Sequence, residues 1–512
     1  MKPMSLLRFA AIALFATAAG AQTTEDWRED LRFLATQLPA RHKNAYASMT
    51  PAQWDAAVKA LDTKLPTLKR HEVIVEFMRL VAVVRDGHTA LAPEFDQERI
   101  GFHRFPIQLY DFSDGLFIIS ADSAHRDIVG AKVTLIGPSS SEAALQTVSK
   151  VISHGSPNWA RARAASLLPI PEVLAAVGVR KDSLTAEFTL EVEGKKRVVT
   201  LKGTGAAGGN AHLAFAQTVN MRRATAGDDP LYLRHADDAW WYTMTDERLL
   251  YIGYRAVAFF ANGQLNEQFF RSAFASGDTA RMERVILDMR DNGGGNNFLN
   301  RAVVKEIVRR PNIDRANGCL VLIGRGVFSA AQNLVNELDY YTNCTFVGEP
   351  TGNAPNQYGD ARPLELPKSK LVVRVSSLLW QSHIASDERA WFQPDYYAEN
   401  SSIDYKSKND AVISMALRKA TGASLAKNLE APAAMGDSAE VRRIIDGHLF
   451  ASSNKYRNPE SDVNAAGYEL LRTGKVSEAV VVFRANVALF PRSGNAWDSL
   501  GEALEQAGKK DE

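Results

Sequence analysis

Ser329 lies in a segment whose residue types suit covalent acyl transfer. In 324–332, GRGVFSAAQ, an apolar strand-like run ends and a helix-like run begins. A serine hydroxyl at such a junction is exposed at a sheet edge, and the amino end of a helix favours an anionic intermediate. A structural alternative exists, because Ser329 with Gln332 fits a capping box. The segment is not the GxSxG elbow of α/β-hydrolases, since Val327 and Ala331 stand where glycines belong.

A glycine run at 293–295 offers backbone donors for such a reaction. The apolar run 285–289 leads through Asp288, Arg290 and Asn292 directly into these three glycines. Glycines at a strand exit let the chain bend sharply and bring N–H groups close to a ligand, which is one way to form an oxyanion hole. Taken alone, the run is better explained as a purely structural, glycine-rich strand-to-helix turn. A phosphate loop is not indicated, because no Gly-Lys-Ser/Thr ending follows.

His88 is the candidate general base. It lies in 85–89, RDGHT, a polar turn that follows a helix-like run. Histidine is the side chain most easily used as a base near neutral pH. The alternative is a surface or capping histidine. Taken together, a serine, a histidine and a glycine-lined bend supply a nucleophile, a base and oxyanion donors.

The surrounding pattern predicts the elements that would position these residues. Residues 24–85 have helical periodicity, 104–203 contain short β-like runs around a helix at 141–151, and 230–420 alternate strands with helices. Such alternation is typical of a largely parallel sheet covered by helices. The predicted strands are 250–254, 285–289, 320–323 and 345–347, and the predicted helices are 264–276, 299–308 and 329–341. A turn is predicted at 262–263, and residues 204–212, rich in Gly and Ala, are predicted to be a loop or linker. Segments around 355–362 and 377–392 are expected to be loops that set specificity.

The tail contains a recurrence of 34 residues. Gly467, Leu470 and Gly474 recur as Gly501, Leu504 and Gly508, while Ala479, Phe483 and Pro491 occupy positions typical of a helical repeat. The tail resembles the tetratricopeptide family over one unit and part of a second. So short an array cannot bury a core alone, and we expect it to dock on the rest of the chain or on a protein partner.

Composition narrows the possible partners. Lys plus Arg (60) nearly balances Asp plus Glu (59), with no basic block, so no nucleic-acid partner is expected. The two cysteines, Cys319 and Cys344, could pair in an oxidising compartment or simply be small buried residues. Neither has zinc-ligand spacing. We therefore expect no metal site and no organic cofactor.

The N-terminus reads as a signal peptide. Lys2 and Arg8 accompany an apolar run at 9–19, and Ala19-Gly20-Ala21 suits cleavage before Gln22. The run is shorter than the roughly 20 apolar residues of a membrane-spanning helix. An uncleaved anchor is the alternative. The sequence predicts a periplasmic or secreted protein with no membrane span after cleavage.

The three segments together resemble serine peptidase family S41, which includes the tail-specific (carboxy-terminal processing) peptidases and the tricorn core peptidase. The resemblance extends over roughly residues 30–420 and also rests on "TFVGEPTG" at 345–352. It implies an α/β fold, with an α/β/α peptidase domain of the ClpP/crotonase-like type. The implied order is a signal peptide at 1–21, a helical segment at 22–100, a β-rich, PDZ-like module at 101–212, the catalytic domain at 213–420, a linker or helix at 421–455 and tetratricopeptide-like repeats at 456–512.

The resemblance also implies roles for particular residues. Ser329 would be the nucleophile and His88 the general base, while the backbone N–H groups of Ala330 and of Gly294 or a neighbouring glycine would form the oxyanion hole. Peptidases of the Ser-Lys type have a lysine 25 residues after the nucleophile. Here that position is Ala354, so a Ser-Lys dyad is not expected.

The tricorn-like branch fits the sequence better, because it uses a histidine base from an N-terminal segment. It also uses a glutamate six residues before a Pro-Asp pair, and Glu388 precedes Pro394-Asp395 by six. Glu388 would then orient His88, with a plain surface carboxylate as the alternative. The serine that directly precedes the histidine in tricorn is replaced by Gly87, a role that Thr89 or Asp86 could fill.

The expected function is therefore peptide-bond hydrolysis of a peptide or protein substrate through an acyl-enzyme, with Ser329, His88 and Glu388 as catalytic residues. Two alternatives stay open. One is a protein of the same fold that binds peptides or apolar ligands without cleaving them. The other is an interaction protein whose main function lies in the repeat-like tail.

Overall fold

The computed structural model describes residues 22–181, 184–192, 194–205, 218–224, 227–235, 238–245, 248–259, 265–420, 425–449, 459–509 and 511. The predicted signal peptide at 1–21 and the predicted turn at 262–263 lie outside these residues. So do most of the predicted loop at 204–212 and part of the linker at 421–455. Among the described residues, no helix is both long and apolar enough to cross a bilayer.

Three helices open the described chain: α1 (Thr24–Arg41), α2 (Pro51–Lys64) and α3 (Arg70–Ala82). Helix α2 begins at Thr50, which forms a capping box with Gln53 and precedes a proline at the first helical position. The apolar residues spaced three and four apart along α1 are buried, namely Trp27, Leu31, Leu34 and Leu38. The helical periodicity of this region is thus confirmed.

A seven-stranded antiparallel sheet follows, with the order β1-β2-β3-β5-β6 and with β4 and β7 pairing at β3 and β2. Its elements are β1 (Ile107–Phe112), β2 (Gly115–Asp122), β3 (Lys132–Ile136), β4 (Ser139–Ser140), β5 (Thr185–Val192), β6 (Lys195–Lys202) and β7 (Thr218–Asn220), with helices α4 (Gln97–Ile100), α5 (Ser141–Ser149), α6 (Pro157–Leu167) and α7 (Pro171–Ala176). This sheet shares one continuous hydrophobic core with α1–α3. The predicted boundary near residue 100 therefore does not separate two cores. We call these elements together the N-terminal body.

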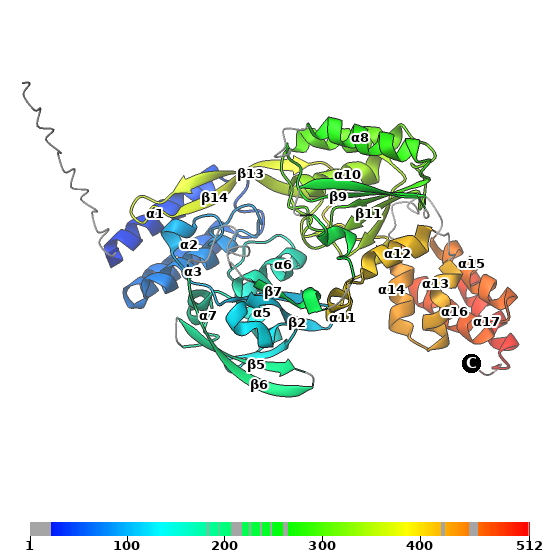
Figure 1. The fold of residues 1–512 in the computed structure, drawn as a ribbon, viewed down its shortest axis with the longest axis horizontal. Helices are drawn as coiled ribbons and strands as arrows, with labels where there is room; N and C mark the ends of the chain where they lie inside the picture. The colour runs from blue at the N-terminus through cyan, green and yellow to red at the C-terminus, as the bar shows by residue number, and fades with distance from the viewer. Residues whose placement is uncertain are drawn as a thin grey trace, which may run out of the picture.

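The second sheet has the order β15-β12-β11-β10-β9-β8, and only β8 is antiparallel to its neighbour. Its strands are β8 (Ala239–Met244), β9 (Leu249–Tyr254), β10 (Arg284–Asp288), β11 (Cys319–Ile323), β12 (Thr345–Gly348) and β15 (Tyr396–Tyr397). Helices α8 (Asn266–Thr279), α9 (Asn300–Val308) and α10 (Ala330–Tyr341) cover one face, and α12 (Ala411–Ala420) packs on the other, after the short α11 (Ser402–Lys406) (Figure 1). The predicted strands and helices of an α/β/α domain are confirmed.

A long hairpin, β13 (Asn356–Glu365) and β14 (Val372–Gln381), replaces the loop predicted at 355–362 and the first part of the loop predicted at 377–392, whereas residues 382–392 form neither strand nor helix. Figure 1 shows the yellow hairpin reaching from the second sheet to the blue α1. Near its tip, Leu364, Leu371 and Val373 are buried in the core of the N-terminal body. The buried carboxylate of Asp30 on α1 accepts hydrogen bonds from the backbone N–H groups of Lys368 and Ser369, at 2.7 and 2.8 Å.

Cys319 and Cys344 form a disulfide, with their Cα atoms 4.7 Å apart. The bond joins the starts of the adjacent parallel strands β11 and β12. Both cysteines are buried in the core between the sheet and α8–α10. The sequence left open whether these cysteines form a disulfide or are simply small buried residues. In the structure they are both paired and buried.

The tail consists of α13 (Leu425–Ala434), α14 (Ser438–Leu449), α15 (Pro459–Arg472), α16 (Val476–Leu489) and α17 (Gly494–Gln506). These helices share a core of their own. Gly467 is needed there, because a Cβ at this position would lie 2.4 Å from the ring of Phe483. Helix α14 docks the tail on the second sheet, where Arg443 lies 5.1 Å from the ring centroid of Tyr397. The expected docking is present, while the repeat family and a protein partner stay predictions.

Candidate active site

A cavity of about 750 Å³ lies between the N-terminal body and the second sheet. Its wall includes Ser329 and Phe328 from the start of α10, His88 from the turn after α3, and Gly293 and Gly295 from the bend after β10. Parallel neighbours β10 and β11 end at the same sheet edge, which brings the glycine bend beside the serine. The three segments singled out in the sequence therefore line one cavity.

Ser329 has a backbone conformation that serine rarely adopts, with φ 55° and ψ −127°. A positive φ strains any residue that has a side chain, and residues strained in this way cluster at functional sites. The residue precedes α10, but its side chain makes no capping hydrogen bond. The capping-box alternative is therefore wrong. The junction has the strand–turn–helix form of a nucleophile elbow although it lacks the elbow's glycines.

Neighbouring side chains hold the strained residue in place. The carbonyl of Ser329 accepts hydrogen bonds from the Asn333 backbone N–H at 3.1 Å and from Gln357 Nε2 at 3.0 Å. Gln357 is buried on β13 and also donates to Asn333 Oδ1 at 3.0 Å. Pattern reading missed Gln357, because its strand was taken for a loop. The base of the β13–β14 hairpin thus holds Ser329 and the start of α10 in place.

Gly294 allows the glycine bend to approach Ser329. A Cβ at Gly294, whose φ is +101°, would lie 2.6 Å from the Ser329 Cβ and 2.8 Å from the Ala330 nitrogen. The Gly294 N–H donates to Asn292 Oδ1 at 2.9 Å, so it is occupied within the bend. Among the hydrogen bonds between described residues, none uses the N–H groups of Ala330, Gly293 or Gly295. The N–H groups of Ala330 and of the two neighbours of Gly294 therefore have no acceptor among the described residues, whereas that of Gly294 does.

His88 packs against the residue that precedes Ser329. Its ring stacks on Phe328, the residue before Ser329, with 4.3 Å between centroids. A Cβ on Gly87 would lie 2.8 Å from this Phe328 ring, which explains why glycine precedes the histidine. Both ring nitrogens of His88 are buried without a well-aligned hydrogen-bond partner. Among the described residues, no hydrogen bond joins His88 to Ser329.

The charge state of His88 follows from its surroundings. Burial lowers its pKa below the ordinary value of histidine, and the charge of Arg374 acts in the same direction. The carboxylate of Asp86 and the backbone of Tyr358 oppose this shift without cancelling it. The imidazole is therefore neutral around pH 7, as a general base requires.

The carboxylate of Asp86 lies beside the His88 ring, with 4.0 Å between the Asp86 Oδ1 and the His88 Nδ1. It accepts hydrogen bonds from Thr89 Oγ1 at 2.7 Å, from the His88 backbone N–H at 3.0 Å and from Ser376 Oγ. His42 Nε2 lies 3.1 Å from Asp86 Oδ2, and His42 Nδ1 accepts from the Asn44 backbone. The proton of a neutral His42 is thus on Nε2, pointing at Asp86.

These bonds keep Asp86 ionised. Burial by itself raises its pKa, but the hydrogen bond from His42, the charge of His88 and the hydrogen bonds from Ser376 and Thr89 lower the pKa to about 2. A fixed negative charge therefore lies beside the Nδ1 edge of His88. The Arg85–Thr89 sequence contained this residue, but two of its four partners, His42 and Ser376, come from distant parts of the chain.

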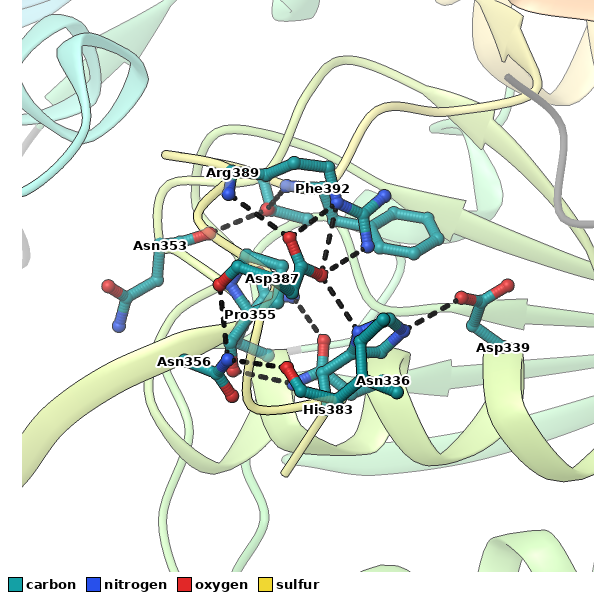
Figure 2. Close-up of polar contacts among 12 residues, drawn as sticks. Asn336, Asp339, Asn353, Pro355, Asn356, His383, Asp387, Arg389 and Phe392 are labelled. Carbon is teal, nitrogen blue, oxygen red and sulfur yellow. Dashed lines mark hydrogen bonds and ion pairs between the residues drawn. The ribbon is translucent and has the colours of Figure 1, made fainter. Parts of the chain in front are cut away.

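Glu388 lies elsewhere. Its side chain is exposed and does not line the cavity. Its neighbour Asp387 binds Arg389, and the Asp387 carboxylate lies 2.8 Å from His383 Nδ1. Figure 2 shows this cluster beside α10, with His383 between Asp387 and Asp339. This arrangement gives Glu388 no contact through which it could orient His88.

Two other sources of chemistry at this site would be a lysine base and a metal ion. No lysine is among the described residues that line the cavity, consistent with Ala354 at the position of the Ser-Lys lysine. Throughout the described part of the chain, no group of three or more histidine, cysteine, aspartate or glutamate side chains is arranged to hold a metal ion. Ser329 and His88, the two side chains singled out in the sequence, are both among the residues that line the cavity.

These features define an α/β/α domain with a strained serine at a strand–helix junction and a histidine supplied by a separate body. Solved structures share the fold. Mature CPAF complexed with lactacystin has a TM-score of 0.55 and 14% identity, covering 77% of this chain and 97% of that one. A CPAF point mutant has a TM-score of 0.56 and 13% identity, covering 78% and 98%. Identities this low establish the fold alone. No protein-family model and no curated protein matches the sequence.

Proposed function

We propose that this chain is a serine peptidase of the S41 type, with Ser329 as its nucleophile. The observation that carries the proposal is the strained φ of Ser329 at the start of α10, in a cavity shared with His88 and the glycine bend. A protein that only binds ligands has no need of a strained, uncapped serine, whereas a nucleophile gains exposure and orientation from it. This favours catalysis over the binding-only alternative.

The proposed reaction has two stages. Ser329 Oγ attacks a peptide carbonyl while His88 Nε2 takes the hydroxyl proton, and the tetrahedral oxyanion accepts hydrogen bonds from Ala330 and a glycine at 293 or 295. The imidazolium then gives its proton to the leaving amine, so that an ester remains on Ser329. Water, activated by His88, hydrolyses the ester and restores the enzyme. The missing Ser329–His88 hydrogen bond is expected to form with substrate bound.

Within this mechanism, Asp86 rather than Glu388 is proposed to position His88. The Asp86 carboxylate lies at the Nδ1 edge of the imidazole, which leaves Nε2 as the base and stabilises the imidazolium. A slight ring rotation would convert the 4.0 Å separation into a hydrogen bond.

Export to the periplasm or medium is proposed as well. The Cys319–Cys344 disulfide supports it, because disulfides persist mainly in oxidising compartments.

The proposal is tested by covalent labelling. A fluorophosphonate reacts with serines activated as nucleophiles, so the intact protein should be labelled at Ser329 and the Ser329→Ala variant should not. Ser140→Ala is a matched control, since Ser140 is an ordinary N-cap whose hydroxyl accepts from the Ala143 N–H. Peptide mapping by mass spectrometry locates the adduct. An intact, folded protein that stays unlabelled would favour the binding-only alternative.

Replacing Asp86 by asparagine should lower kcat by about 10²- to 10⁴-fold. The variant should also move the acid limb of the pH–rate profile to lower pH. The base must be neutral, so activity falls as pH drops through the pKa of His88. Asp86 raises that pKa, and its loss lets the pKa fall further. Steady-state kinetics between pH 4 and pH 8 measure both effects.

Asp30→Asn provides the control for Asp86→Asn. Asp30 is an equally buried carboxylate that accepts two backbone hydrogen bonds, both from the tip of the β13–β14 hairpin rather than from residues around His88. Its replacement should lower thermal stability and leave the pH profile unmoved. If Asp86→Asn also lost only stability, the positioning role would be refuted.

A further inference from the structure

We infer that His383 is a positioning residue for the proposed nucleophile, and that it acts through the backbone of residues 382–392 and the side chains of Asn356 and Gln357. This inference rests on the proposed function, because it concerns the reactivity of Ser329. It goes further in giving a role to a largely buried histidine that no motif singled out and that does not line the cavity.

His383 lies between two carboxylates. Its Nδ1 is 2.8 Å from Asp387 Oδ2, and its Nε2 is 3.4 Å from Asp339 Oδ2. The side chains of all three residues are largely buried, at 12% exposure for His383, 5% for Asp387 and 9% for Asp339. Figure 2 shows the imidazole ring between these two acids. Only an imidazolium donates from both ring nitrogens, so it is the form that can bond to both acids at once.

The two acids anchor His383 to different parts of the chain. Asp387 lies with His383 in residues 382–392, which we call the 382–392 segment, and it also binds Arg389. Asp339 lies on α10. The Asp339 Oδ1 is buried without a hydrogen-bond partner among the described residues, so His383 supplies its counter-charge. A buried carboxylate is costly unless a cation pairs with it, and this contact therefore ties the segment to α10.

The same segment in turn holds Asn356, the first residue of β13. Asn356 Nδ2 donates to the carbonyls of Ile384 and Asp387, at 2.9 and 3.1 Å. One residue earlier, the Pro355 carbonyl accepts a hydrogen bond from Asn336 Nδ2 of α10 at 2.8 Å. The start of β13 is therefore fixed between α10 and the segment that the histidine anchors.

Gln357 follows Asn356 directly and connects this strand to the nucleophile. Its Nε2 donates to the Ser329 carbonyl and to Asn333 Oδ1, both at 3.0 Å. The strained φ of Ser329 persists only while its surroundings hold it. A displacement of about 1 Å at a reacting atom can cost on the order of 100-fold in rate. Releasing the segment at His383 should therefore slow the attack of Ser329.

His383→Ala should lower kcat by about 10- to 100-fold and leave KM within about twofold of the intact enzyme, because it disturbs the geometry of attack and not the cavity wall. His383→Arg should recover part of the loss, since a planar cation can contact both acids and the groove of about 860 Å³ that His383 borders gives it room. A histidine with a purely structural role would lower only the melting temperature. Steady-state kinetics and circular dichroism melting measure these quantities.

His448→Ala is the matched control. His448 is a comparably buried histidine, 13% exposed, whose Nε2 lies 3.2 Å from an Asp462 carboxylate oxygen in the tail. Its loss should lower the melting temperature and leave kcat unchanged. A loss of kcat equal to that of His383→Ala would attribute both to general destabilisation and overturn the inference.

Asn356→Ala tests the next contact along the same path. It removes the two hydrogen bonds to the 382–392 segment without leaving a buried charge, so it should fold even if His383→Ala does not. It should reproduce the loss of kcat, and combining it with His383→Ala should add no more than about a further threefold, since both act through the same strand. Full kcat in folded Asn356→Ala would overturn the inference.

Hydrogen exchange separates this inference from the peptidase proposal. The Asn333 backbone N–H donates to the Ser329 carbonyl. In His383→Ala, the amides in the first turn of α10 should exchange about tenfold faster than in the intact protein, with the amides of α16 as an unaffected reference. Unchanged exchange would overturn the inference. Faster exchange in a chain that hydrolyses no peptide would support the link from His383 to Ser329 and count against the peptidase proposal alone.

Discussion

Replacing Ser329 by alanine should lower kcat for peptide hydrolysis by about 10⁴- to 10⁶-fold, because the bond-forming oxygen is removed. The residual rate should reflect binding and the oxyanion donors alone. Thermal stability should change little, since the Ser329 side chain makes no capping hydrogen bond. Single-turnover kinetics on a peptide library, combined with differential scanning calorimetry, measure both quantities.

A second substitution at the same residue tests whether the strain is real. Ser329→Gly should be equally inactive but more stable than Ser329→Ala by about 1 kcal/mol, because glycine adopts a φ of 55° without steric cost. Full activity in Ser329→Ala would remove the proposed nucleophile and with it the mechanism.

Replacing His88 by alanine should lower kcat by a similar factor of about 10⁴ to 10⁶. Without a base, the Ser329 hydroxyl is a poor nucleophile at neutral pH. The double variant Ser329→Ala/His88→Ala should be no slower than either single variant by more than about tenfold, since residues that act as one unit are not additive. Rates of the two single variants and the double variant, measured on one peptide, give the coupling free energy between Ser329 and His88.

His125→Ala is the control for this series. His125 is a partly exposed histidine paired with Asp122 and outside the cavity, so its loss should leave kcat unchanged. If the activation free energies lost in the two single variants added up in the double variant, Ser329 and His88 would act independently. The acid–base pair would then have to be sought elsewhere.

The second sheet could be predicted well because its strands are short, continuous apolar runs that alternate with amphipathic helices. β11 and β12 begin within one residue of their predicted starts, and α10 begins one residue after the predicted helix. These features depend on local sequence, since a strand buried on both faces must be apolar throughout. The same local signals placed Ser329 and the glycine bend at neighbouring strand ends.

Other features depend on residues far apart in the sequence. The β13–β14 hairpin was taken for loops, because many of its residues are polar and its buried ones pack against helices some 300 residues earlier. The ionised state of Asp86 requires His42 and Ser376, and no spacing rule connects them. The choice of Glu388 as the orienting carboxylate relied on a short family pattern rather than on contacts.

The shared core of the N-terminal body limits how early, during synthesis and folding, the chain can become active. Leu364, Leu371 and Val373 complete that core, and Asp30 finds its hydrogen-bond donors only at Lys368 and Ser369. A nascent chain therefore contains His88 long before, and Ser329 shortly before, the hairpin that completes the core has been synthesised. Contacts between residues so distant in sequence form late and slowly. An incompletely synthesised or still-extended chain should consequently be inactive toward the proteins around it.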